Sequence, residues 1–149
     1  MKKTYKSTIS EYSLKYTKSE IQKTKITTSE SAYSVIKKFY FDDINIYESF
    51  FILLLNKANN TTGFAKISQG GTAGTVVDIK IIAKYAVESL SSAVIICHNH
   101  PSGNIKPSEA DINITKKIKD ALLLLDISLT DHIILSENNY YSFADNGDL

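Results

Sequence analysis

Two short, uninterrupted apolar runs limit the folds open to this chain of 149 residues more than any other feature of its sequence. One run lies within residues 48–56 and the other covers residues 93–97. Each is shorter than a typical helix and rich in residues that favour extended backbone, so each predicts a buried strand inside a sheet. One or two edge strands are expected before residue 28, and further strands are predicted at residues 63–68, 133–135 and 140–143.

Three segments combine a helix-capping residue with apolar residues at helical spacing. The first begins near Thr27, with Glu30 three positions later as in a capping box. Asp78 caps the second, and Ser108 caps the third, which extends to about residue 125. The pattern therefore predicts one α/β domain, with a mixed central sheet flanked by helices. The helical positions expected to face the core are Ala32, Val35, Ile36, Phe39, Ile81, Ile82, Tyr85, Ala86, Leu90, Ile112, Ile118, Leu122 and Leu125.

The charge of the chain is distributed unevenly. The first 40 residues hold 9 Lys and 3 Glu, whereas the remaining residues hold 8 Lys and 13 Asp or Glu. All 17 basic residues are Lys, and Arg, the side chain best suited to bidentate contacts with phosphate or guanine, is absent. We therefore expect a basic N-terminal extension over residues 1–28, most simply a solvated surface, followed by a domain over residues 29–149.

Other compositional features point to a cytoplasmic protein. No apolar run approaches the roughly 20 residues that a membrane-spanning helix needs, so we expect no membrane association. The basic N-terminus is followed by polar residues rather than by the apolar stretch of a secretion signal. The single cysteine, Cys97, has no partner for a disulfide within the chain, which fits a reducing compartment.

A pair of histidines directly follows the second buried run. Alternate residues of an extended segment share a face, so His98 and His100 are expected on one side, with their neighbours on the other. Asp111 stands in the first turn of the helix capped by Ser108, and the proline-bounded loop before it can fold that turn over the strand end. Two imidazoles and one carboxylate leave a fourth tetrahedral position for water, as in a catalytic zinc site. Each residue also has an ordinary explanation, because single histidines are commonly structural and Asp111 can complete a capping box.

The spacing of these residues resembles the JAMM metal motif of the JAB/MPN family of metal-dependent peptidases and deubiquitinases. His98, His100 and Pro101 are followed, without insertion or deletion, by Ser108 and Asp111. The longer blocks at residues 98–111 and 131–134 narrow the resemblance to the RadC-like branch, and the resemblance covers about residues 29–149. It implies a cytidine-deaminase-like fold and one Zn²⁺ per chain, held by His98, His100 and Asp111.

The same resemblance implies two catalytic residues besides the metal ligands. The family uses a Glu on an earlier strand as general base, and Glu48, at the opening of the central strand, matches it. The ordinary alternative for Glu48 is an exposed charge at a strand end, and Glu88 competes for the role although it lies late on a helix and is expected to face solvent. Ser108 would donate to the substrate oxygen that becomes negative, besides capping its helix.

Two other features are expected near the site. His132 follows Asp131 at the start of a strand, and we interpret it as a residue behind the ligands or in the core rather than as a ligand. The glycine-containing loop at residues 68–75 could border a cleft, because glycine permits close approach of the backbone. It lacks the Gly-Lys-Ser/Thr ending of a phosphate-binding loop.

These observations predict a zinc-dependent hydrolase of the RadC-like JAB/MPN type that cleaves peptide or isopeptide bonds in a protein or peptide substrate. Other zinc hydrolases fit less well, since a His-Glu-x-x-His helix is missing and one cysteine cannot form a deaminase Cys pair. The alternative is a DNA-repair-associated or DNA-binding protein with a non-catalytic metal site, in which the Lys-rich extension contacts phosphate. A purely structural or partner-binding domain is a third interpretation, and exposed edge strands could form a homodimer.

Overall fold

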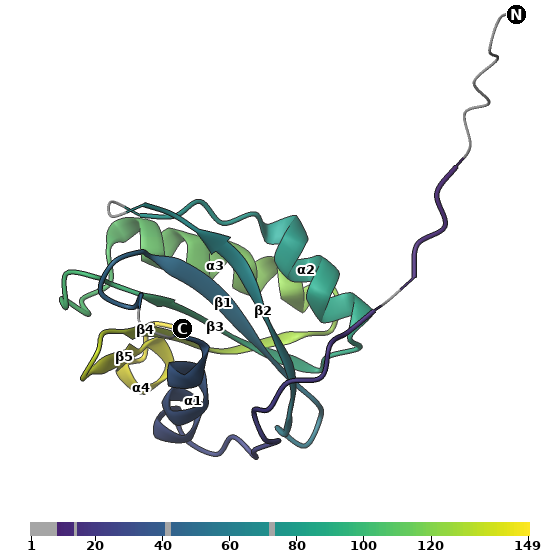
Figure 1. The fold of residues 1–149 in the computed structure, drawn as a ribbon, viewed down its shortest axis with the longest axis horizontal. Helices are drawn as coiled ribbons and strands as arrows, with labels where there is room; N and C mark the ends of the chain where they lie inside the picture. The colour runs from purple at the N-terminus through teal and green to yellow at the C-terminus, as the bar shows by residue number, and fades with distance from the viewer. Residues whose placement is uncertain (1–8, 14, 41–42, 72–73) are drawn as a thin grey trace, which may run out of the picture.

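The computed structural model describes residues 9–13, 15–40, 43–71 and 74–149 of the chain. Five strands, four α-helices and one 3-10 helix make up this part of the molecule (Figure 1). In chain order they are α1 (Ser29–Ile36), η1 (Lys37–Phe39), β1 (Ser49–Leu55), β2 (Thr61–Gln69), α2 (Ile79–Glu88), β3 (Ala93–Asn99), α3 (Glu109–Leu123), β4 (Ser128–Leu135), β5 (Tyr140–Ser142) and α4 (Phe143–Asn146).

The five strands form one sheet in the order β2-β1-β3-β4-β5. β1 pairs antiparallel with both β2 and β3, β3 pairs parallel with β4, and β4 pairs antiparallel with β5. The two apolar runs of the sequence are therefore interior strands, as predicted. The predicted fold class, an α/β domain with a mixed central sheet flanked by helices, is confirmed.

Helices cover both faces of the sheet. Figure 1 shows α2 and α3 on one side and α1 on the other. The even-numbered residues of β1 from Phe50 pack in a core with α2 and α3, whereas the odd-numbered residues from Phe51 pack in a core with α1. All residues of β1 and β3 are buried, and this burial on two faces explains why the two runs are continuously apolar rather than alternating.

The first helix is capped one residue later than predicted. Thr28, not Thr27, is the N-cap of α1, and its side chain accepts a hydrogen bond from the amide of Ser31 at 3.1 Å. The Ser31 hydroxyl accepts from the amide of Thr28 at 3.0 Å, so Ser31 takes the place predicted for Glu30 in the capping box. A hydroxyl partner serves here because the box needs only one short side chain that can reach back to the cap.

Several apolar positions predicted to face the core are exposed instead. α2 and α3 are the outer layer on their side of the sheet, so only a narrow stripe of each helix reaches the core. That stripe consists of Ile82 and Ala86 on α2 and of Ile118 and Leu122 on α3. The predicted core positions that are exposed are Ile81, Tyr85, Leu90, Ile112 and Leu125.

The edge strands expected before residue 28 are not formed in the described part of that segment. The side chains of Tyr12 and Tyr16 are 91% and 84% exposed, so they gain no burial that could offset the entropy of ordering a strand. The other apolar residue of that predicted alternation, Leu14, lies outside the described residues. Within the described residues, strand-like pairing of the extension is limited to an isolated bridge between Lys25 and Asn60.

The C-terminal strands also differ from their predicted bounds. β4 begins at Ser128, earlier than predicted, because its first residues alternate between exposed and buried and so lack a continuous apolar signal. Phe143 does not end the last strand but opens α4. Ser142 caps α4 and accepts from the amide of Asp145 at 3.1 Å.

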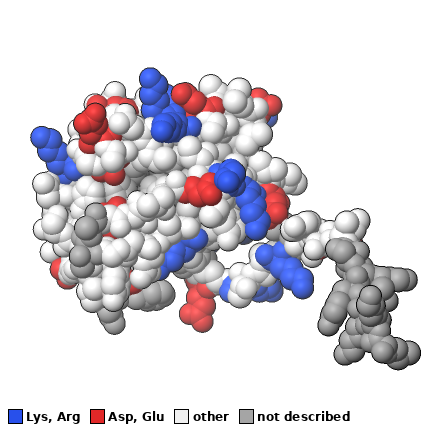
Figure 2. All heavy atoms as spheres, turned by 90° about the horizontal axis from the view of Figure 1, so that it is seen from above, with Lys and Arg blue, Asp and Glu red and all other residues white. Residues whose placement is uncertain are grey.

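The surface carries charges of both signs. Figure 2 shows basic and acidic side chains interspersed over the body of the molecule on one face. The lysines of the extension that the structure describes are exposed, namely Lys15, Lys18, Lys23 and Lys25. No helix among the described residues has the length and apolar character needed to cross a membrane.

Candidate metal centre

The carboxyl end of β3 carries both predicted histidine ligands. His98 pairs with Phe50, a residue of the core beneath α2 and α3, which places the imidazole on that face of the sheet. The amide of His100 donates to the carbonyl of Leu135 in β4 at 2.9 Å, so the chain remains extended through His100. The imidazole of His100 therefore returns to the face of His98.

A short loop leads from β3 to the start of α3. The carbonyl of His100 accepts from the amide of Gly103 at 3.0 Å, closing a turn in which Gly103 has a φ of +84°. This left-handed conformation favours glycine. Ser108 then caps α3, and Asp111 lies in the first turn of that helix, over the end of β3.

Three side chains bring potential ligand atoms together at this point. His98 Nε2 lies 2.9 Å from His100 Nε2. Asp111 places Oδ1 3.1 Å from His98 Nε2 and Oδ2 3.4 Å from His100 Nε2. Ligand atoms that share a tetrahedral zinc ion, with bonds of about 2.0–2.2 Å, are about 3.3–3.6 Å apart. The spacing of these atoms is thus near that of neighbouring ligands around one small cation.

A chain of hydrogen bonds behind His98 determines which of its nitrogens faces the cluster. The hydroxyl of Thr115 donates to the carbonyl of Asp111 at 2.5 Å, so its oxygen is left to accept from Nδ1–H of His132 at 2.6 Å. Nε2 of His132 is then an acceptor, and it accepts from Nδ1–H of His98 at 2.8 Å. We call this chain the Thr115–His132 relay. It leaves the Nε2 lone pair of His98 directed at the cluster.

His132 is suited to the relay because it is neutral. The side chain is fully buried, and this burial lowers the pKa of its imidazole well below the ordinary value. A neutral imidazole has one donor and one acceptor, which is what the relay requires. His132 thus lies behind the ligands, in the position expected from the sequence.

An extra residue in β4 turns His132 toward the ligands. The register with β3 skips Thr130, which stands unmatched between Leu129 and Asp131 as a β-bulge. Leu129 and His132, three residues apart, consequently face the same side of the sheet. An uninterrupted alternation would turn His132 toward α1 and Asp131 toward the ligands.

The loop after β3 orients the second histidine. His100 Nδ1 lies 2.6 Å from the carbonyl oxygen of Asn104, which can only accept, so Nδ1 carries the proton. Nε2 of His100 then presents its lone pair to Nε2 of His98, and two lone pairs 2.9 Å apart repel unless a proton or a cation lies between them. The hydrogen bond with Asp111 raises the pKa of His100, so a proton competes with a metal ion for this position. The donor set therefore fits a divalent metal ion.

The carboxylate of Asp111 serves the helix and the cluster together. Its Oδ2 accepts from the amide of Ser108 at 2.8 Å, and its own amide donates to Ser108 Oγ at 3.1 Å, which completes a capping box. Burial acts to raise the pKa of Asp111, but the neighbouring imidazoles of His100 and His98 outweigh it and hold the pKa well below the ordinary value. Capping and ligation, which the sequence left as alternatives, are compatible in this side chain.

Glu48 lies in the same pocket as the ligands. It immediately precedes β1 and is two residues before Phe50, so it shares the sheet face of His98. With His98 and Asp111 it lines a pocket of about 210 Å³. The side chain is half-buried, and its carboxylate makes no hydrogen bond or ion pair with any described residue. Glu48 is thus a carboxylate free to act at the mouth of the cluster.

The remaining predicted site residues occupy different surroundings. Ser108 is exposed, its Oγ accepts from the helix, and its hydroxyl donates no hydrogen bond within the described part of the chain. Glu88 is exposed at the end of α2 and lines a hollow elsewhere, so it does not compete with Glu48. In the loop at residues 68–75, Thr75 lines the pocket beside Glu48. Thr72 and Ala73 of that loop lie outside the described residues.

Sequence reasoning did not single out Thr115. Its signal was available, because Asp111, Thr115, Ile118 and Leu122 follow one another at helical spacing and Thr115 is the polar member of a buried stripe. A buried hydroxyl at that spacing needs a partner. The partners are the carbonyl of Asp111 and the ring of His132.

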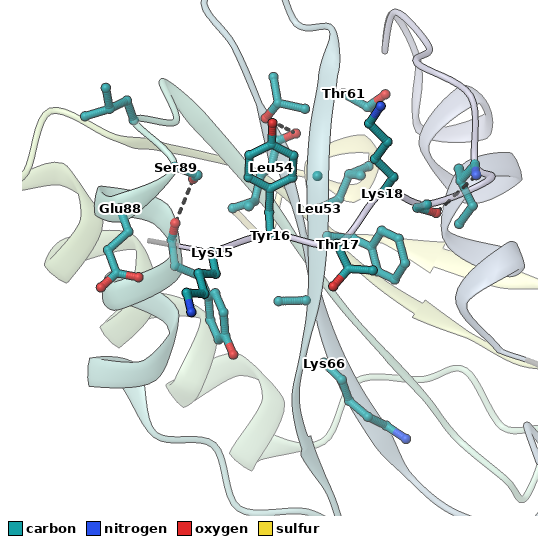
Figure 3. Close-up of a pocket in the computed structure, with 18 of the residues that line it drawn as sticks. Lys15, Tyr16, Thr17, Lys18, Leu53, Leu54, Thr61, Lys66, Glu88 and Ser89 are labelled. Atoms are coloured by element: carbon teal, nitrogen blue, oxygen red, sulfur yellow. Dashed lines mark hydrogen bonds between the residues drawn. The ribbon is translucent and has the colours of Figure 1, made fainter. Parts of the chain in front are cut away.

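A larger hollow, of about 1520 Å³, lies at the opposite end of β1. Figure 3 shows it between residues of the extension, such as Tyr16 and Lys18, and the strand residues Leu53 and Leu54. Its walls carry Lys and Glu side chains but neither the histidine ligands nor Asp111 or Glu48. Among the described residues, the predicted site residues Glu48, His98 and Asp111 therefore line the smaller pocket and not the larger hollow.

Comparison with known proteins shows the family to which the chain is similar. A family model described as RadC-like JAB domain matches residues 26–148. UPF0758 proteins are 43% identical over 123 residues in Flavobacterium johnsoniae and 41% identical over 123 residues in Porphyromonas gingivalis. These matches cover 83% and 82% of this chain and 53% of each relative. A UPF0758 protein of Shewanella baltica is 39% identical over 68% of this chain and 45% of its own length. The chain thus spans about half the length of the curated relatives it matches.

Proposed function

This chain belongs to the RadC-like JAB domain family, and we propose that it is a zinc-dependent hydrolase that cleaves peptide or isopeptide bonds with a metal-activated water. The observation that carries the proposal is the convergence of His98 Nε2, His100 Nε2 and the Asp111 carboxylate, with both imidazoles held so that their lone pairs face one point. Glu48 in the same pocket adds a carboxylate that is not engaged by another described side chain. Two His and one carboxylate form a set typical of catalytic zinc.

His98, His100 and Asp111 would hold the ion. When bound, zinc supplies a Lewis acid for a carbonyl oxygen and lowers the pKa of water at the site to about 7. Glu48 accepts the proton of the attacking water and later delivers it to the leaving amine. The relay keeps His98 in the tautomer that can bind metal, and Asn104 does the same for His100.

Ser108 supplies the oxyanion donor in this proposal. Its oxygen accepts from the amide of Asp111, and its proton remains available for the substrate oxygen that becomes negative during attack. Capping fixes the hydroxyl at the end of the helix, where the positive end of the dipole adds to the same effect. One hydroxyl can thus cap α3 and donate to the substrate.

The experiment that tests the proposal begins with metal content. Protein purified without a histidine tag is analysed by plasma mass spectrometry beside the double variant His98→Ala/His100→Ala. We expect about one zinc per chain in the wild type and loss of zinc in the variant. A wild type that retains no metal after addition of zinc would remove the basis of the proposal.

Activity is then screened with peptide and isopeptide libraries, using Glu48→Gln as the inactive reference. The amide cannot accept the proton, so turnover is expected to fall about 10²–10⁴-fold while zinc is retained. Glu88→Gln is the matched control, because Glu88 is exposed and distant from the pocket. Equal turnover in Glu48→Gln and wild type would refute the assignment of Glu48.

A DNA-associated role with a non-catalytic metal site is the alternative that these experiments also address. Its support is the Lys-rich extension, but the hollow beside the extension in Figure 3 is lined by Glu88 as well as by Lys15 and Lys18. Phosphate binding by several lysines would appear as a steep fall of DNA affinity with salt. Zinc-loaded protein without turnover but with that salt dependence would favour the alternative over hydrolysis.

A further inference from the structure

The structure assigns Asn99, the residue between the two histidine ligands, a role in positioning Glu48, and we propose that it holds the backbone on both sides of that carboxylate. The inference rests on the hydrolytic function proposed above. Asn99 points to the face of the sheet opposite the ligands and is fully buried. It touches neither substrate nor ligand atoms and would act only through Glu48.

The side-chain amide of Asn99 is fully used. Its Oδ1 accepts from the amide of Ser49 at 2.8 Å. Its Nδ2 donates to the carbonyl of Tyr47 at 2.7 Å and to the carbonyl of Ile44 at 2.6 Å. Tyr47 and Ser49 are the two chain neighbours of Glu48. One buried side chain thus fixes the residue before the carboxylate, the residue after it and the loop that leads to it.

This arrangement replaces backbone pairing at the point where two strands separate. The pairing of β1 with β3 extends to Phe50 and His98. Beyond it, His100 bonds to Leu135 of β4, so β3 turns away from β1 and carries His100 into the cluster. The amide of Ser49 would lose its partner there, and a buried amide without a partner destabilises the fold. The side chain of Asn99 supplies the missing acceptor.

The consequence is a short structural connection between Glu48 and the two histidines. The carbonyl of Glu48 accepts from the amide of Gly70, the residue after β2, at 2.8 Å, so its backbone is held from that side as well. Asn99 connects that backbone to the strand between His98 and His100 without an intervening residue. Misplacement of a catalytic group by about 1 Å can lower a rate about 10²-fold. Release of the Asn99 bonds is therefore expected to reduce proton transfer without removing a ligand.

The test uses Asn99→Asp in the full chain. The substitution preserves shape and the acceptor for Ser49, but it places an oxygen against the carbonyls of Tyr47 and Ile44, so both donated bonds are lost. Asn138→Asp is the matched control, because Asn138 is exposed in the loop before β5. Asn99→Ser is the second variant, which removes the double donor without adding a buried charge and guards against failure to fold.

Turnover of a peptide selected from the library is measured in a double-mutant cycle with Glu48→Gln. Asn99→Asp or Asn99→Ser is expected to lower kcat about 10–100-fold, with KM changed less than about 2-fold and zinc content retained. In the Glu48→Gln background the same substitution is expected to change kcat less than about 2-fold, because the group it positions is already disabled. A full additional loss in that background would overturn the inference.

A spectroscopic measurement separates failure of this inference from failure of the proposed function. In protein loaded with Co²⁺, the pH at which the visible spectrum changes reports the ionisable groups at the ion. We expect Asn99→Ser to shift this pH in the same direction as Glu48→Gln, and Asn138→Asp to leave it unchanged. Asn99→Asp is omitted from this measurement, because its added carboxylate would shift the pH directly. If the wild type hydrolyses no peptide, the hydrolase proposal fails and this spectrum still tests the link. A spectrum of Asn99→Ser that matches the wild type while Glu48→Gln differs would overturn the link alone.

Discussion

The first turns of α1 and α3 contain the same local motif, but its side chains make different contacts in the two helices. Each helix opens with a capping box, formed by Thr28 and Ser31 in α1 and by Ser108 and Asp111 in α3. In α1 both partners are hydroxyls, and the box serves only the start of the helix. In α3 the partner is a carboxylate whose two oxygens also lie within 3.4 Å of the Nε2 atoms of the two histidines.

The difference continues one turn further along each helix. Four residues after Ser31 stands Val35, which is buried in the apolar core with β1. Four residues after Asp111 stands Thr115, which is equally buried but donates to the Asp111 carbonyl and accepts from His132. One local motif thus yields either a purely structural helix start or part of a candidate metal site. The residues around it decide which.

The largest effect is expected from replacing Asp111, the acidic residue of the α3 capping box. Asp111→Asn retains an acceptor for the cap but removes the ligand charge, so zinc affinity should fall at least about 10³-fold, beyond the 10–100-fold typical of a residue behind the ligands. Ser31→Ala, the same position in α1, should leave zinc affinity unchanged. Competition with a chromophoric chelator measures both, and comparable zinc loss in the two variants would contradict the distinction between the boxes.

The two cap residues should share one effect and differ in another. Thr28→Ala and Ser108→Ala are each expected to lower the free energy of unfolding by about 1 kcal/mol, because each removes one acceptor from a helix start. Only Ser108→Ala should also lower kcat, by about 10²–10³-fold, as expected for a lost oxyanion donor. Denaturant unfolding and peptide turnover separate the two effects. Unchanged kcat in Ser108→Ala would limit Ser108 to capping.

Exchanging the residue types of Thr115 in α3 and Val35 in α1 tests the Thr115–His132 relay. Thr115→Val gives α3 the pattern of α1 and leaves Nδ1–H of His132 without its acceptor, so zinc affinity should fall about 10–100-fold. The reciprocal Val35→Thr buries a hydroxyl among apolar side chains and should cost about 1–3 kcal/mol of stability without affecting zinc. Chelator competition and unfolding are again the measurements. Normal zinc affinity in Thr115→Val would exclude the relay as a determinant of the His98 tautomer.

The smallest effect concerns pH in metal-free protein. The pKa of Asp111 is lowered, mainly by His100 and His98 against the effect of burial, so it contributes stability above its unfolded value near 4, lost as pH falls through the folded pKa. The pKa of His100 is raised by Asp111, so it contributes stability below about 6.5, lost as pH rises through the folded pKa. Both contributions overlap between about pH 4 and 6.5.

Within that window Asp111→Asn should destabilise the metal-free protein most, and the difference from wild type should decrease toward higher pH. Thr28→Ala should show a pH-independent loss, because the α1 box contains no ionisable group. Urea unfolding in the presence of a chelator, repeated across the pH range, measures both. A difference between Asp111→Asn and wild type that grows above pH 7 would contradict the ion pair between Asp111 and His100.

The sequence predicted the interior strands and the ligand cluster because both depend on local patterns. Continuous apolar runs report burial on two faces, and His98, His100 and Asp111 are set by strand alternation and one capped helix. The extension was predicted wrongly because Tyr12 and Tyr16 alternate with polar residues but have no surface to pack against. Alternation alone does not supply a partner strand.

Other features depended on contacts distant in sequence and could not be predicted locally. Asn99 bonds to residues about 50 positions earlier, as with the amide of Ser49. Which residue of α3 meets His132 depends on how that helix crosses β4. The narrow contact of α2 and α3 with the sheet left Ile81 and Ile112 exposed although their helical spacing is that of a core face. In each case the neighbouring element, rather than the segment itself, decides the outcome.

Thr130 changes the sheet face on which each later side chain of β4 lies. Each side chain after Thr130 lies on the face opposite to the one that a regular alternation counted from Leu129 would give. As the first result, His132 rather than Asp131 faces the histidines. Regular pairing of Thr130 with Ile95 would bring a carboxylate among the histidines and an imidazole against α1, two changes that no single substitution can repair. Deletion of Thr130 would instead leave Asp131 opposite Ile95 and His132 opposite Ile96, in a strand without a bulge. We therefore expect the pairing of His132 with Ile96, rather than the number of residues in β4, to be inherited together with the relay.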